Sequence, residues 1–88
     1  MMNKQKINDI KERLSKLRSL SWKSYIEGRD HEAGDSFIMV GEGDNRGEDI
    51  YLTGATDDEQ DFIAHAPEDI SFLLKEIEKL EIQNDSQN

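Results

Sequence analysis

Apolar residues near both ends of the chain recur at the spacing of a helix face. Four near each end follow one another at steps of three, four and three: Ile7, Ile10, Leu14 and Leu17 at the start, and Ile70, Leu73, Ile77 and Leu80 at the end. This spacing gathers each set into one narrow stripe, here called a seam. The seams predict helices over 4–20 and 67–82, each marginal alone in water. We therefore expect the seams to cover each other over one face of a sheet, or each to meet its copy in a second chain.

Between the helices, short runs of β-favouring residues alternate with turn-forming residues. The runs predict strands at 22–27, 36–40 and 49–53. The short connections between these strands favour an antiparallel meander. Gly28 and Gly34 bracket the first connection, which indicates a loop.

The second predicted strand carries apolar residues on both faces. Phe37 and Met39 alternate with Ile38 and Val40, whereas a sheet with one wet face alternates apolar with polar side chains. One layer of helices covers only one face, so the other face must meet something else, and a copy of the chain is the commonest partner. We expect a homodimer or a higher homo-oligomer, with the loop at 27–37 at or near the interface.

A capping signal and a proline punctuate the last third of the chain. Thr56 and Glu59 match a capping box, in which a hydroxyl and a carboxylate satisfy free backbone N–H groups reciprocally. A short helix should follow over 57–65. Pro67 disfavours the helical state at the residue before it and suits the first turn of a new helix, so we expect a bend at Ala66.

Together these elements predict one small α+β domain over 1–88. Its order is an N-terminal helix, a three-stranded antiparallel meander, a short helix, a break at the proline and a C-terminal helix. The tail at 83–88 has no apolar anchor and is expected to be disordered. The predicted core consists of the two seams and one aromatic residue of the short helix: Ile7, Ile10, Leu14, Leu17, Phe62, Ile70, Leu73, Ile77 and Leu80.

The net charge of −9 over 88 residues is unevenly distributed. Residues 1–25 carry a net charge of +5, and residues 26–88 carry −14. An acidic protein repels nucleic acid at long range, so direct nucleic-acid binding is not expected. The chain has no cysteine, and no apolar run suits a membrane span or a signal peptide. We expect a cytoplasmic protein without membrane contact.

Most of the candidate chemistry lies between the first two predicted strands. The stretch 22–37 combines aromatic side chains, one arginine, one histidine and two glycines. Aromatic side chains stack on flat ligands, and arginine presents a planar fork to phosphates or carboxylates. The candidate ligand-binding residues are Trp22, Tyr25, Glu27, Arg29, Asp30, His31, Asp35, Ser36 and Phe37.

A structural role for the same residues is an open alternative. Trp22 would then belong to the core. Arg29 would hold the loop in place by pairing with one acidic neighbour among Asp30, Asp35 and Asp49. Both roles use the same side chains, so the sequence leaves the choice open.

Neither metal binding nor catalysis has a specific signal. His31 has acidic neighbours on both sides, but no metal-ligand spacing connects it to other candidates. The acidic segment at 42–48 fails as a calcium loop, because Arg46 occupies an expected oxygen position. Ser36 lacks the turn and the spacing of a catalytic triad. We therefore predict no catalytic residues, no metal, no cofactor and no enzymatic activity.

Three segments of the sequence resemble a known group of proteins. EGRDHEAGDSFI at 27–38, DIYL at 49–52 and DFIAHAPEDISFLLKEIEKL at 61–80 resemble a family of small uncharacterised proteins encoded by phages, prophages and Gram-positive bacteria. The resemblance extends from Trp22 to Leu80 and leaves out the basic first helix. It implies an accessory protein of a phage or mobile element, for which interference with a host system is expected. It carries no activity that can be transferred.

Two functions remain open. In the first, a non-enzymatic accessory protein binds and sequesters a nucleotide-like ligand such as a defence messenger, with Trp22 or Tyr25 stacked on the base and Arg29 at the phosphate. In the second, the acidic surface binds a host protein, as an inhibitor or adaptor that mimics nucleic acid. The carboxylates assigned to this second role are Asp57, Asp58, Asp61, Glu68, Asp69, Glu76 and Glu78.

Overall fold

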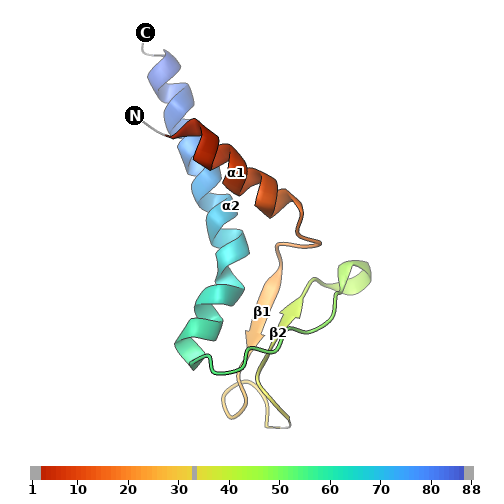
Figure 1. The fold of residues 1–88 in the computed structure, drawn as a ribbon. Helices are drawn as coiled ribbons and strands as arrows, with labels where there is room; N and C mark the ends of the chain where they lie inside the picture. The colour runs from red at the N-terminus through yellow and green to blue at the C-terminus, as the bar shows by residue number, and fades with distance from the viewer. Residues whose placement is uncertain (1–2, 33, 87–88) are drawn as a thin grey trace.

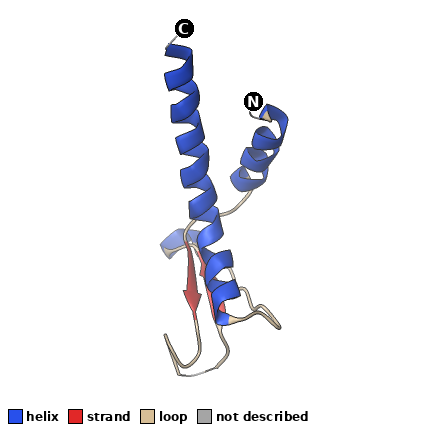
Figure 2. Cartoon of the chain, turned by 90° about the vertical axis from the view of Figure 1, so that its left-hand side faces the viewer, coloured by secondary structure: helices blue, strands red, loops and turns tan. Residues whose placement is uncertain are grey.

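One helix packs against a two-stranded antiparallel sheet and a second helix crosses the first one beyond the sheet (Figures 1 and 2) in the computed structural model, which describes residues 3–32 and 34–86. In chain order, the elements are helix α1 (Lys4–Ser15), strands β1 (Trp22–Tyr25) and β2 (Phe37–Val40), the 3-10 turn η1 (Gly43–Asn45) and helix α2 (Asp57–Ser86). The predicted α+β class is confirmed. Within the described part of the chain, no helix is long and apolar enough to cross a membrane.

Helix α1 starts where the sequence predicts but ends earlier. Asn3 caps its N-terminus by accepting a hydrogen bond from the backbone N–H of Lys6 at 3.0 Å. At the other end, the Ser15 hydroxyl donates to the carbonyl of Glu12 at 2.7 Å. A serine that bonds the backbone in this way competes with continuation of the helix. The longer predicted helix is therefore wrong, and Leu17 of the first seam lies beyond α1.

The sheet has two strands, because the predicted third strand reduces to one bridge. Ile50 exchanges two backbone hydrogen bonds with Ile38, at 2.8 and 2.9 Å. The next bond, from the N–H of Gly47 to the carbonyl of Val40 at 2.8 Å, is displaced by one residue from that register. A ladder requires a constant register, so the segment at 49–53 forms no strand and the three-stranded meander is wrong.

Helix α2 is continuous and contains Pro67 in its interior. The predicted short helix, the break at Ala66 and the separate last helix are therefore wrong. Pro67 removes one backbone hydrogen bond and crowds the preceding turn, and Figure 1 shows the axis of α2 changing direction part-way along. The proline is itself buried, so packing offsets this cost. Residues 83–86 of the predicted tail are helical, and 87–88 lie outside the described residues.

The predicted capping box at the start of α2 is confirmed. The N–H of Thr56 donates to Oε1 of Glu59 at 2.8 Å, and the N–H of Glu59 donates to Oγ1 of Thr56 at 3.1 Å. The bond from the Thr56 backbone lowers the pKa of Glu59. The box fixes the point at which the chain leaves the sheet and α2 begins.

The core lies between α2 and the sheet, and it extends along α2 as far as Leu74. Its buried apolar residues are Ile26, Ile38, Val40, Ala64 and Leu74. The predicted core is wrong, because α1 and α2 cross at an angle instead of lying along each other (Figures 1 and 2), so each seam covers little of the other. Of the predicted core residues, Leu17, Phe62, Leu73 and Leu80 are exposed, and the rest are half-buried: Ile7, Ile10, Leu14, Ile70 and Ile77.

One buried polar side chain, Gln60, joins α2 to both strands. It is only 4% exposed. Its Nε2 donates to Oγ of Ser24 at 3.0 Å, to the carbonyl of Tyr25 at 3.2 Å and to the carbonyl of Phe37 at 3.1 Å. The amide therefore fixes the position of the helix over the sheet, because a shift of either element breaks these bonds.

Candidate functional site

The sheet has one face covered by α2 and one face left open. Side chains alternate between the faces of a strand. The covered face carries Ser24, which bonds Gln60, and Ile38, which is fully buried. The nine candidate residues are divided among four places. Tyr25, His31 and Phe37 lie on the open face, and Trp22 lies on the covered face. Arg29 and Asp30 belong to an ion-pair network with α2, and Glu27, Asp35 and Ser36 remain in the loop.

Four rings on the open face form what is here called the aromatic cluster: Tyr25, His31, Phe37 and Tyr51. The Phe37 ring lies at the centre, 5.1 Å from the Tyr25 ring and nearly parallel to it, 5.4 Å from His31 and 6.1 Å from Tyr51. These are separations of favourable ring pairs. Nζ of Lys23 lies 5.3 Å from the centre of the Tyr25 ring, which adds a cation–π contact. Tyr51 is 59% exposed, so the cluster opens to solvent at this ring.

The guanidinium of Arg29 is bound by two carboxylates of its own chain. Its Nη1 and Nη2 reach both carboxylate oxygens of Asp61 at 2.8 and 3.1 Å, and its Nε and Nη2 reach Oδ2 of Asp30 at 3.1 and 2.8 Å. A guanidinium has five N–H groups, so little of this one remains for a phosphate. Oδ2 of Asp30 also accepts from the N–H of Ile26 at 2.8 Å, which ties the network to the backbone.

This network shifts the pKa values of all three charged groups. Hydrogen bonds to Asp61, and then those to Asp30, raise the pKa of Arg29. The guanidinium lowers the pKa of Asp61 to about 2, with a smaller contribution from Ser24. It also lowers the pKa of Asp30, with help from the Ile26 N–H. The structural alternative for Arg29 named Asp30 as a partner, whereas Asp61 was not predicted.

Trp22 and the loop residues make structural contacts. Nε1 of Trp22 donates to the carbonyl of Ser19 at 3.0 Å, and its half-buried ring lines a groove between the helices. In the loop, the N–H of Glu27 donates to Oγ of Ser36 at 3.0 Å. Gly28 has a φ of 89°, in the left-handed region that glycine adopts without strain. These bonds shape the loop without aiming its polar groups at a common point.

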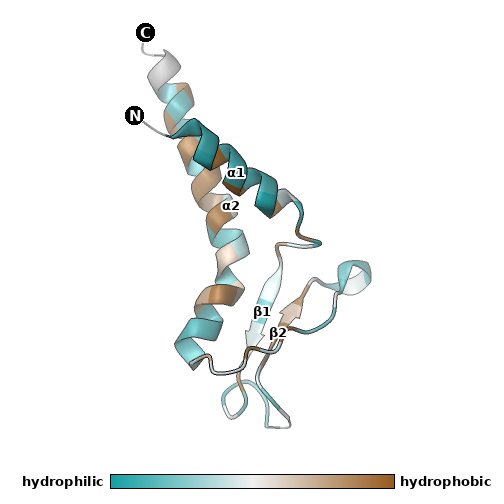
Figure 3. Ribbon diagram, viewed as in Figure 1, coloured by the Kyte–Doolittle hydropathy of each residue, from teal (hydrophilic) through white to brown (hydrophobic). Residues whose placement is uncertain are grey.

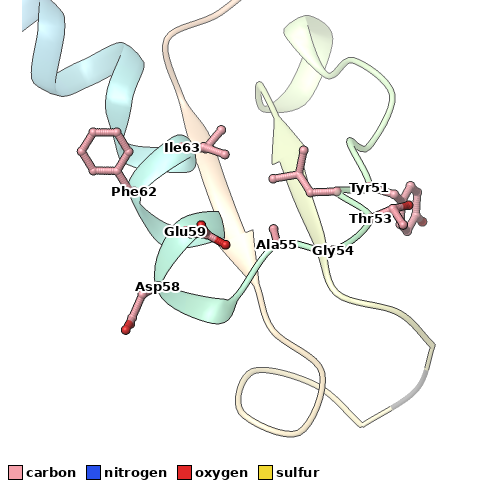
Figure 4. A pocket seen from close by; sticks show the side chains of 9 residues that line it. Tyr51, Thr53, Gly54, Ala55, Asp58, Glu59, Phe62 and Ile63 are labelled. Carbon is pink, nitrogen blue, oxygen red and sulfur yellow. The ribbon is translucent and has the colours of Figure 1, made fainter.

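Two hollows near the start of α2 do not bring together polar side chains that could bind a common ligand. One, of about 610 Å³, lies between the segment at 51–55 and the first turns of α2. Figure 4 shows the side chains of Asp58 and Phe62 directed away from that segment. The other, of about 360 Å³, contains Asp35 and Asp57, whose like charges disfavour an anionic ligand. In the described ranges, no group of three His, Asp or Glu side chains is placed to hold a metal ion.

Three residues of these networks were absent from the predicted site: Lys23, Tyr51 and Asp61. Strand alternation is a signal for Tyr51, because its ring must face away from the covered side on which its neighbour Ile50 lies. Asp61 has no local signal, since it lies 32 residues from Arg29 and meets it only in the folded chain.

Comparisons of the chain with protein-family models, with curated proteins and with solved structures give no significant match. They therefore assign neither a family nor a function. The geometry of the described residues is the basis for the functional inference.

Proposed function

We propose that this protein is a non-enzymatic binding protein of the cytoplasm that holds a flat-ringed, nucleotide-like ligand against the aromatic cluster. The observation that carries this proposal is the group of rings on the open sheet face, with Tyr51 accessible to solvent. A wet sheet face ordinarily carries polar side chains, so an exposed aromatic face suggests a ligand or a partner. The resemblance of residues 22–80 to phage and prophage proteins supports a role in sequestering such a ligand.

The cluster provides stacking, and Lys23 provides a cation beside it. A ligand ring on Tyr51 and Phe37 would gain about 1–3 kcal/mol, the usual range for base–aromatic stacking. The ammonium of Lys23, close to the Tyr25 ring, is exposed and available to an anionic group of the ligand. Arg29 has no part in this arrangement, because its guanidinium already bonds two carboxylates.

Isothermal titration of the full chain with nucleotides, cyclic dinucleotides and ADP-ribose tests this proposal. Tyr51→Ala should weaken binding about 5- to 150-fold by removing the outermost stacking ring. Phe72→Ala is the matched control, because Phe72 is 61% exposed on α2, outside the cluster, against 59% for Tyr51. The proposal fails if none of these compounds gives heat at high protein concentration. It also fails if both variants lose the same affinity.

The acidic binding function remains a second candidate because of four carboxylates in the first half of α2. Asp57, Asp58, Glu68 and Asp69 are exposed and form no ion pair within the described residues. The other carboxylates assigned to this role are neutralised inside the chain: Asp61 by Arg29, Glu76 by Lys79 and Glu78 by Lys11.

A pull-down from host lysate distinguishes this second function. The wild type should recover a basic protein at low salt and lose it at high salt, because exposed charges are screened. Replacing Glu68 and Asp69 with lysine should abolish recovery, whereas Tyr51→Ala should leave it unchanged. A lysate from which nothing is recovered at low salt would count against the acidic surface.

A further inference from the structure

An apolar groove of about 550 Å³ separates the two helices. Its walls are formed by both seams, including Ile7, Ile10 and Leu14 on α1 and Ile70, Leu73 and Ile77 on α2. Arg13 is the one charged side chain among the described residues that line it. Figure 3 shows hydrophobic residues along the length of α2 that rises above the sheet.

The single chain is too open to cover this groove. Its radius of gyration is 16.6 Å, against about 12 Å for a compact domain of this length. Leu73 and Leu80 are each 57% exposed, and Leu17 is 36% exposed. Side chains of this size at helical spacing lose favourable burial when they remain in water, so the groove requires an occupant.

The seam of α2 has the pattern of a bundle-forming helix. Together with the two residues that precede it at the same spacing, Ile63 and Ala66, the seam has an isoleucine every seven residues and a leucine or alanine between them: Ile63, Ala66, Ile70, Leu73, Ile77 and Leu80. Helices with this repeat pack by inserting side chains into holes on a facing helix. The shorter seam of α1 repeats the same steps, so both helices present bundle-type surfaces to the groove.

Charges beside the seams identify what fits the groove. Lys6 and Arg13 lie along one side of the α1 seam, whereas Asp69 and Glu76 lie along one side of the α2 seam. Glu76 pairs with Lys79 at 3.4 Å, and Asp69 makes no ion pair with any described residue. Arg13 makes no ion pair with any described residue. An amphipathic helix with acidic side chains beside its apolar stripe complements both the groove and Arg13, and α2 of another copy is such a helix.

We propose that a second copy of this chain fills the groove, with α2 of each copy lying between the helices of the other. Two α1 and two α2 helices then form a four-helix bundle in which Arg13 faces an acidic flank of the second copy. Figure 1 shows the described loop residues 27–32 and 34–37 at the other end of the molecule from α1, so this interface does not include them. The pairing is independent of the ligand proposed for the aromatic cluster.

Sedimentation equilibrium of the full chain at micromolar concentration tests the assembly. The wild type should give twice the 10.1 kDa mass of one chain. Leu73→Asp should raise the dimer dissociation constant at least about 100-fold, because it buries an unpaired charge in the bundle. The matched control is Phe72→Asp, which adds the same charge at the neighbouring exposed position, on the polar side of α2, and should remain dimeric. Circular dichroism should show both variants helical.

A charge reversal gives a second test that leaves the apolar seam intact. Arg13→Glu should weaken the dimer at least about tenfold by placing like charges together. Lys16→Glu makes the same change in net charge at the C-cap of α1, where Lys16 pairs with Glu12 at 3.5 Å and does not line the groove, and should have little effect. A wild-type mass of one chain at high micromolar concentration, or of three or more chains, would overturn the proposal. So would equal dimer affinities for Arg13→Glu and Lys16→Glu.

Discussion

Replacing Gln60 tests how α2 is held on the sheet. Gln60→Leu keeps the volume of the side chain but removes the donor that serves Ser24, Tyr25 and Phe37 at 3.0 to 3.2 Å. A buried acceptor left without its donor costs about 1–3 kcal/mol. We expect Gln60→Leu to lower the free energy of unfolding by that amount, a large share of the roughly 5–15 kcal/mol of a typical domain.

Gln60→Glu adds a pH dependence with a definite sign. An ionised carboxylate at this buried site would face two backbone carbonyl oxygens, with the Ser24 hydroxyl as the one neighbour of Nε2 that can donate, so we expect its pKa to be raised in the folded state. A group whose pKa is raised on folding stabilises the protein below its unfolded pKa, and that stability is lost as pH rises through the folded pKa. A rise of about two units corresponds to about 2.7 kcal/mol. We therefore compare the free energies of unfolding of Gln60→Glu and Gln60→Leu. The difference should favour Gln60→Glu more at pH 4 than at pH 7.

Urea unfolding followed by the fluorescence of Trp22, the only tryptophan, measures both variants. The protein concentration must be fixed throughout, because association shifts apparent stability. Gln5→Leu is a control, since Gln5 is exposed and its side chain donates to Asp9 on the same helix. A loss below about 0.5 kcal/mol for Gln60→Leu would refute the linking role of the amide. A pH-independent difference between Gln60→Glu and Gln60→Leu would refute the electrostatic reasoning.

Two further substitutions test the cap and the ion-pair network. Thr56→Ala should cost about 0.5–2 kcal/mol by leaving the N–H of Glu59 without its acceptor, and an unchanged melting temperature relative to exposed Thr53→Ala would contradict this. Folding lowers the pKa of Asp61 from 3.8 to about 2, so its stabilisation is present above about pH 4 and is lost as pH falls towards 2. Asp61→Asn should make the free energy of unfolding depend less on pH in that window. Asp58 makes no ion pair with a described residue, so Asp58→Asn should leave this pH dependence unchanged. If the free energy of unfolding falls equally with pH in the wild type and in Asp61→Asn, the ion pair of Asp61 with Arg29 does not cause the acid sensitivity.

The features that the sequence predicted correctly depend on neighbouring residues. Thr56 and Glu59 are three residues apart, so their reciprocal bonds follow from the start of a helix alone. The pairing of β1 with β2 follows from two β-favouring runs joined by a loop. In each case the energy that selects the structure comes from groups the sequence already places side by side.

The features that escaped prediction depend on distant contacts. Pro67 favours a break locally, but burial keeps α2 continuous through it. Ile50 has the neighbours of a strand residue, yet the shift of Gly47 against Val40 ends the ladder after one bridge. The ion pair of Arg29 joins residues 32 positions apart. Local propensity is a weak prior when tertiary packing acts against it.

The spacing of a seam indicates that an apolar stripe needs to be covered, but it does not identify the surface that covers it. The seam from Ile70 to Leu80 lies on the part of α2 beyond the sheet, where its own chain offers only the crossing α1. If a second copy covers this seam, the aromatic cluster remains outside the bundle, because it lies on the opposite side of the sheet from α2. A dimer would then display two ligand surfaces, and linked sites raise the avidity for a bivalent ligand. The two proposals are separable by this geometry: Leu73→Asp should remove the dimer and preserve stacking, and Tyr51→Ala should do the reverse.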